Sequence, residues 1–168
     1  MRKIIGGAVI FMLIAFVTQW VVVKEVPSWV YKIAIHRTDH QFNKWINSGN
    51  TDAKMRRVVM PNPDFVYSAL FYDVTHKTVT ISGILPDSTY ASVSFYDDRC
   101  QPYYVYNNLD ATRKGKFELN LGNSDKTEAH AIRAKTGRGV VICRFLKSTD
   151  SSYQQLVPFQ KVLSCEVH

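Results

Sequence analysis

The polar residues best spaced for chemistry lie in residues 58–73, which read VVMPNPDFVYSALFYD. Asn62, Asp64 and Tyr67 fall within six residues of one another, and Asp73 closes the same run. An amide, a carboxylate and a phenol that converge in a pocket could bind a polar ligand or serve a hydrolase. The same residues could instead fix a structural turn, because Asn and Asp side chains bond to nearby backbone. The sequence leaves both interpretations open.

Two other polar groups have simpler explanations. His36 and His40 could offer two metal ligands on a helix, but a pair without a third ligand more commonly marks a solvated face. Aspartates in loops at strand ends account for three carboxylates that could otherwise gather around a cation: Asp97, Asp98 and Asp110. We identify no phosphate loop, serine nucleophile elbow or dinucleotide fingerprint, so the sequence predicts no metal and no cofactor.

Tyrosines are concentrated in one predicted hairpin, at Tyr96, Tyr103, Tyr104 and Tyr106. An exposed aromatic platform could bind sugar rings or a protein partner. Core packing together with strand propensity is the commoner reason for such a cluster.

A membrane anchor precedes all of these residues. Residues 4–23 read IIGGAVIFMLIAFVTQWVVV, and twenty helical residues span about 30 Å, the thickness of a bilayer's hydrocarbon core. Arg2 and Lys3 lie before this run, so the positive-inside rule puts the N-terminus in the cytoplasm and the remainder outside. A cleaved signal peptide is the rival, but the apolar run is long and no small-residue cleavage site follows it. Residues 1–25 are therefore predicted to be an uncleaved single-pass anchor.

Residues 26–50 are predicted to form a short juxtamembrane helix and linker. Pro27 and Ser28 can open a helix, and apolar residues recur at roughly helical spacing as far as Trp45 and Ile46. The helix should end near residues 47–50 and either rest on lipid headgroups or pack on the domain that follows.

Residues 51–168 show the period-two alternation of β-strands with one buried face. Val79 and Ile81 alternate with threonine and serine, for example, and Phe117, Leu119 and Leu121 alternate with polar residues. Seven strands are predicted, near residues 65–73, 77–84, 90–97, 102–107, 116–121, 128–134 and 139–147. The run at 139–146 is apolar on both faces and should be a central strand. The fold class is thus mainly β, an immunoglobulin-like antiparallel sandwich, with a tail at 151–163 that is either helical or extended.

The positive net charge of the chain bears on the kind of partner it could bind. The net charge is +7, and the basic residues are dispersed along the chain rather than gathered with aromatics on one element. That pattern argues against a nucleic-acid-binding protein and is compatible with contact to the headgroups of the lipid bilayer.

Three cysteines follow the anchor, so one thiol must be left over if a disulfide forms. A bridge between Cys143 and Cys165 would join the tail to the sandwich and leave Cys100 free. Three reduced thiols are the alternative, and the spacings fit no zinc site.

The segment at 62–73 resembles the bacterial family called domain of unknown function 1254, which has an Asn-x-Asp-x-x-Tyr run before a strand that ends in Asp. Asn62, Asp64, Tyr67 and Asp73 match those positions, and the resemblance covers roughly residues 50–150. Met60 and Phe65 depart from the family pattern. The resemblance implies an immunoglobulin-like sandwich. Longer relatives carry a second β domain, domain of unknown function 1214, which implies a separately encoded partner of that type here.

These observations favour a non-enzymatic module, anchored in the bacterial inner membrane and facing the periplasm, that binds a partner envelope protein. The alternatives are a hydrolase, or a solute or glycan binder, with a pocket near Asn62, Asp64 and Tyr67.

Overall fold

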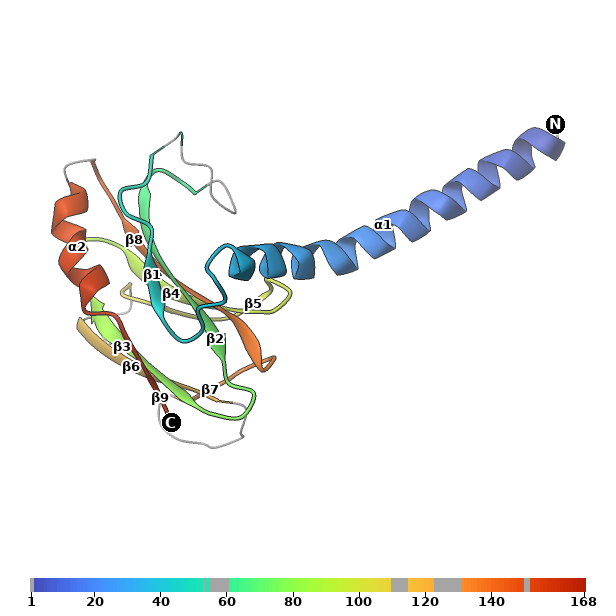
Figure 1. Ribbon diagram of the computed structural model, residues 1–168. Coiled ribbons are helices and arrows are strands. Elements are labelled where there is room, and N and C mark those ends of the chain that lie inside the picture. The colour runs from blue at the N-terminus through green and yellow to red at the C-terminus, as the bar shows by residue number, and fades with distance from the viewer. Residues whose placement is uncertain (1, 53, 55–60, 110–114, 123–130, 150–151) are drawn as a thin grey trace.

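A single long helix leads into the β domain (Figure 1). The computed structural model describes residues 2–52, 54, 61–109, 115–122, 131–149 and 152–168. Helix α1 runs without interruption from Arg2 to His36, and its first part projects away from the rest of the chain. Its large apolar side chains are bare there; Phe11 and Phe16 are 71% and 72% exposed. Among the described residues, there is one helix that is long enough and apolar enough to cross a membrane, and it is α1.

The predicted juxtamembrane helix ends earlier than expected, at His36 rather than near residue 47. Asp39, His40 and Asn43 have φ angles of 51°, 53° and 55°, in the left-handed region, where a right-handed helix cannot continue. After this turn, Phe42 forms an isolated β-bridge with Phe71 in strand β2, Phe65–Asp73.

Strand β1, Trp45–Asn47, then pairs with β2. The apolar residues of this segment are spaced as in a helix, but hydrogen bonding to β2 makes it a strand instead. The β structure therefore begins before residue 51, the predicted start of the domain.

Two sheets make up the domain. The five-stranded sheet has the order β1-β2-β8-β4-β5 and is antiparallel throughout. Its remaining strands are β2 Phe65–Asp73, β4 Ala91–Asp97, β5 Pro102–Asn107 and β8 Arg138–Leu146. The four-stranded sheet has the order β7-β6-β3-β9, with β3 Val79–Leu85, β6 Gly115–Gly122, β7 Ala131–Arg133 and β9 Ser164–Val167. Here β7 is parallel to β6 and the other pairs are antiparallel.

The mainly β prediction is confirmed, and β8 lies in the centre of its sheet as its apolar sequence predicted. The predicted strands agree with the observed ones to within about two residues, except that residues 128–130 lie outside the described part of the chain. The ambiguous tail forms helix α2, Tyr153–Lys161, followed by β9.

The inward faces of the two sheets share one core. The alternating residues of β2, β4 and β8 supply one side of it and those of β3 and β6 the other; the largest fully buried members include Tyr72, Phe95, Phe145, Leu70, Ile81 and Leu119. A second, smaller cluster lies on the outer face of the five-stranded sheet. There Tyr31 and Ile35 of α1 pack on Phe71 of β2, with Phe42 and Val140 beside them. The end of α1 is thus part of the domain's packing.

Candidate functional site

Asn62, Asp64 and Tyr67 do lie together, but as a turn. The backbone N–H of Asp64 donates to Asn62 Oδ1 at 2.9 Å, and the N–H of Asn62 donates to the Tyr67 hydroxyl at 3.2 Å. Asn62 and Asp64 are exposed, and Tyr67 is half-buried. These bonds form an Asx-type turn that starts β2. They supply no observation in favour of a hydrolase or of a solute-binding pocket.

Asp73 is at the opposite end of β2, about 26 Å away along nine residues of strand. Its carboxylate accepts bonds from the Thr75 backbone N–H at 3.1 Å and hydroxyl at 2.8 Å, and from Arg138 Nε at 2.8 Å. Partial burial raises the pKa of Asp73, but these three hydrogen bonds and the Arg138 charge together lower it below its usual value. The four predicted site residues therefore belong to two separate places.

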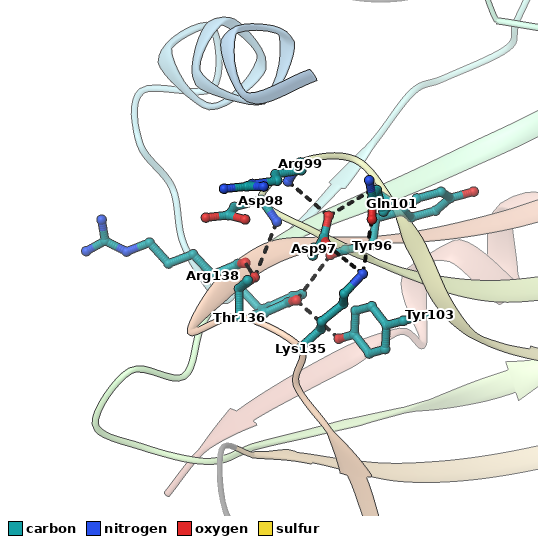
Figure 2. A network of polar contacts seen from close by, with 10 residues as sticks. Tyr96, Asp97, Asp98, Arg99, Gln101, Tyr103, Lys135, Thr136 and Arg138 are labelled. Atoms are coloured by element: carbon teal, nitrogen blue, oxygen red, sulfur yellow. Dashed lines mark hydrogen bonds and ion pairs between the residues drawn. The ribbon is translucent and has the colours of Figure 1, made fainter. Parts of the chain in front are cut away.

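A denser polar network lies at the Asp73 end of the sheet (Figure 2). Asp97, only 2% exposed, accepts hydrogen bonds at Oδ1 from the backbone N–H groups of Arg99 and Gln101 at 2.9 and 2.8 Å. Its Oδ2 lies 3.4 Å from Lys135 Nζ. These contacts fix the loop at 98–101 between β4 and β5. Asp98 follows in this loop, whereas Asp110 lies outside the described residues.

Two tyrosine hydroxyls extend the network into the core. Tyr72 donates to the Tyr96 carbonyl at 3.1 Å, and the Tyr103 hydroxyl lies 3.1 Å from that of Tyr72. Burial raises the pKa of Tyr103 to about 12 and raises that of Tyr72 further. Both phenols are therefore uncharged near neutral pH.

Gly139 makes this arrangement possible. It is directly opposite Tyr72 in β2 and Asp97 in β4. A Cβ at this position would overlap the Tyr96 carbonyl oxygen and the Tyr72 hydroxyl. The network thus needs a residue without a side chain at the start of β8.

The same end of the domain holds α1. Tyr31 and Phe71 have ring centroids 5.9 Å apart, and Cys100 Sγ donates to the Pro27 carbonyl at 3.6 Å. We call this region the anchor end: α1 from Pro27 to His36, the loop at 98–101, and the residues of β2 and β8 that they contact. It connects the helix to the domain through side-chain contacts as well as through the chain.

A second region is concave. A groove of about 430 Å³ lies between β1, α2 and β9, and it is lined by Asn43, Lys44, Trp45, Asn47, Gln160, Lys161, Leu163, Ser164 and Cys165. We call it the edge groove, because β1 and β9 are the edge strands of the two sheets. Trp45 Nε1 donates to the Ser164 carbonyl at 3.1 Å across it. Gln160 Nε2 donates to the Tyr67 carbonyl at 2.9 Å and to Ser68 Oγ at 3.0 Å, which holds α2 against β2.

Sequence reasoning missed the edge groove because it treated residues 42–47 as helix and left the tail unassigned. One signal was present. Asp39, His40 and Asn43 are residue types that tolerate a positive φ, so their clustering indicates a break in the helix.

The remaining candidates have simple environments. His36 Nδ1 and His40 Nε2 are 3.4 Å apart and exposed. Across the described residues, no group of three His, Cys, Asp or Glu side chains is arranged to hold a metal. Tyr106 is 8% exposed and Tyr104 packs on Phe95 with centroids 5.7 Å apart, so the rings contribute to the core.

All three cysteines are free in the structure. Cys143 lies in β8 and Cys165 in β9, in different sheets, and no bond joins them. Burial raises the pKa of the Cys165 thiol to about 11 and raises that of Cys143 further.

Comparison with known proteins gives a family and a fold. A family model described as "Protein of unknown function (DUF1254)" matches residues 42–166. The crystal structure of the VPA0106 protein from Vibrio parahaemolyticus is similar to 83% of this chain, with a TM-score of 0.64 and 13% identity. This chain covers 34% of that protein, about a third of its length. A structure of an uncharacterized protein from Burkholderia cenocepacia aligns with 84% of this chain at 12% identity, covering 39% of its own length, with a TM-score of 0.46. A search of proteins with curated descriptions finds no match.

Proposed function

Because the chain belongs to the DUF1254 family of proteins of unknown function, we propose its role from its geometry. It is a non-enzymatic interaction module, anchored in the bacterial inner membrane with its β domain in the periplasm, that binds a partner envelope protein at the edge groove. The two-sheet arrangement supports an immunoglobulin-like sandwich as the framework of this module.

The edge groove is the observation that carries this proposal. It brings the outer edges of β1 and β9 to one side of the domain, and edge strands present backbone N–H and C=O groups to an incoming strand. Val162, beside the lining residues Lys161 and Leu163, is 46% exposed, and Val167 of β9 is 49% exposed. Apolar side chains next to unpaired strand edges are typical of a surface that a partner covers.

We propose that the partner is a separately encoded β-domain protein of the domain of unknown function 1214 type. In the Vibrio parahaemolyticus protein the same fold is about a third of the chain, so there it occurs together with further sequence. The proposed partner would supply a neighbouring β surface to the edge groove. Recognition would then involve backbone pairing along β9 and burial of the two valines.

A crosslinking experiment tests the proposal. The full chain would carry a photo-crosslinking amino acid at Val162 or Val167 in living cells, and crosslinked products would be identified by mass spectrometry. We expect both positions to capture the same β-domain envelope protein. Glu118, exposed on β6, is the matched control and should capture nothing.

Two results would count against the role. Absence of a common product at Val162 and Val167 would remove the groove as an interface. A C-terminal reporter active only in the cytosol would contradict the periplasmic orientation.

A further inference from the structure

The position of α1 fixes how close the domain lies to the membrane. Residues 4–23 fill the hydrocarbon core, and Pro27 follows Val23 by four residues, or about 6 Å of helix. The helix continues through Pro27 to His36. Because the headgroup layer is about 5–7 Å deep on each side, Pro27 lies at its outer boundary.

The loop at 98–101 is held at this same height. Its Cys100 thiol contacts the Pro27 carbonyl, and Figure 2 shows the helix passing beside Asp98 and Arg99. Tyr31 and Ile35 pack the following turns of α1 on the sheet, and Cys100 of the loop packs against the same cluster. Lys24, over the Trp20 ring at 4.1 Å, marks the boundary of the apolar span, and Glu25 offsets its charge.

The most exposed charges of the loop region are positive, and Asp98, the loop's own acid, is half-buried next to Arg99. Arg99 is exposed, and the side chains of Lys135 and Arg138 are 51% and 57% exposed. Their carboxylate partners are covered: the side chain of Asp97 is 3% exposed and that of Asp73 is 18% exposed. A guanidinium can bind a phosphate through two N–H groups at once. Asp97 and Asp73 thus hold the side chains of Lys135 and Arg138 in position, while the two cations remain exposed to solvent.

We propose that the loop at 98–101, with Arg99 exposed on it, lies at the outer boundary of the headgroup layer and binds anionic phospholipid headgroups. This inference rests on the proposed membrane anchoring. It makes the anchor end a second membrane contact that fixes the orientation of the domain and leaves the edge groove for a partner.

The full chain in nanodiscs provides the test. Thermal unfolding of the domain would be followed by near-ultraviolet circular dichroism, in phosphatidylcholine alone and with phosphatidylglycerol added. We expect a higher midpoint with the anionic lipid for the wild type. Arg99→Glu should abolish this increase, since one basic residue near an anionic surface changes binding about fivefold. Lys116→Glu, an equal charge change at an exposed position on β6 of the other sheet, should keep it.

The outcomes separate this inference from the membrane anchor itself. An equal midpoint in both lipids for the wild type, or an unchanged increase in Arg99→Glu, would overturn headgroup binding. Extraction of the full chain from membranes by alkaline carbonate would instead contradict the anchor. Arg99→Gln, which removes the charge without adding a negative one, should give an intermediate increase.

Discussion

The anchor end and the edge groove are both held by polar contacts, but of different kinds. At the anchor end the contacts involve charge: Asp97 with Lys135, and Asp73 with Arg138. At the edge groove they are neutral, from Gln160 to the backbone and hydroxyl of β2 and from Trp45 to β9. The first set joins the ends of β4 and β2 to the residues around the start of β8, and the second joins α2 to β2 and β1 to β9.

This difference shows how one small domain can combine a helix-bound end and an open side. At the anchor end the loop at 98–101 contacts α1 through Cys100, and the buried carboxylate of Asp97 has partners on both oxygens. The edge groove keeps two strand edges and exposed valines facing outward. The anchor end is thus suited to fixing the domain in position, and the edge groove to recognising another chain.

Gly139→Ala should have the largest effect and would damage the anchor end alone. The new Cβ would overlap the Tyr96 carbonyl oxygen and the Tyr72 hydroxyl, which requires a backbone shift. We expect a loss of about 3 kcal/mol in unfolding free energy, measured by denaturant unfolding of the full chain in detergent. Gly49→Ala is the control, since Gly49 has a φ of 73° but open space, and should cost only about 1 kcal/mol. Equal losses would show that the Tyr96 carbonyl and the Tyr72 hydroxyl can shift at little cost to admit the new methyl group.

Gln160→Leu should have the next largest effect on stability, because it removes the hydrogen bonds that hold α2 against β2 at the edge groove. The Tyr67 carbonyl and Ser68 Oγ would lose a donor in a buried place, at a cost of about 2 kcal/mol. The same unfolding experiment measures this, and crosslinking from Val162 should weaken because α2 is no longer held. Normal stability together with normal crosslinking would mean that α2 is positioned by apolar packing.

Tyr72→Phe should cost less, about 1 kcal/mol, because the ring stays in the core and only the hydroxyl is removed. The anchor end and the edge groove share none of these partners. The Tyr72→Phe and Gln160→Leu double variant should therefore be additive within about 0.5 kcal/mol. A larger coupling energy would show that the anchor end and the edge groove do not contribute independently to stability.

Acid should weaken the anchor end through Asp73. Its pKa is lower in the folded than in the unfolded protein, so the Asp73 contribution is present above the unfolded value and lost as pH falls through the folded one. The stability difference between wild type and Asp73→Asn should therefore shrink below about pH 4. Unfolding curves measured across that range test this prediction. Thr75→Val removes one of the hydrogen bonds that lower the pKa of Asp73. In that background, the stability difference between the protein with Asp73 and its Asp73→Asn variant should be smaller at neutral pH.

Thiol labelling should show the smallest effect, a difference in rate. Cys143 is fully buried and its pKa is raised, so a maleimide should modify it last in the native protein. Mass spectrometry after unfolding without reductant should find all three cysteines labelled. Failure of Cys143 and Cys165 to react under those conditions would support the disulfide that the sequence leaves possible.

Seven of the strands could be predicted because apolar residues recur at alternate positions or in a short continuous run, whereas β1 and β9 were missed. The contents of the candidate site could not. Asn62 and Asp73 are eleven residues apart in the same short run, yet a nine-residue strand separates them in space. Asp97 and Lys135 are distant in the sequence and meet only because β4 pairs with β8.

The sequence by itself determined the apolar helix, the mainly β class and the central position of β8, because hydrophobic periodicity is a local property of the chain. The tertiary structure alone decided that Trp45 belongs to a strand, that α2 lines a groove and that Cys100 contacts Pro27. Each of these depends on contacts between segments far apart in the sequence, whose free energies outweigh the weak local preferences of the residues involved.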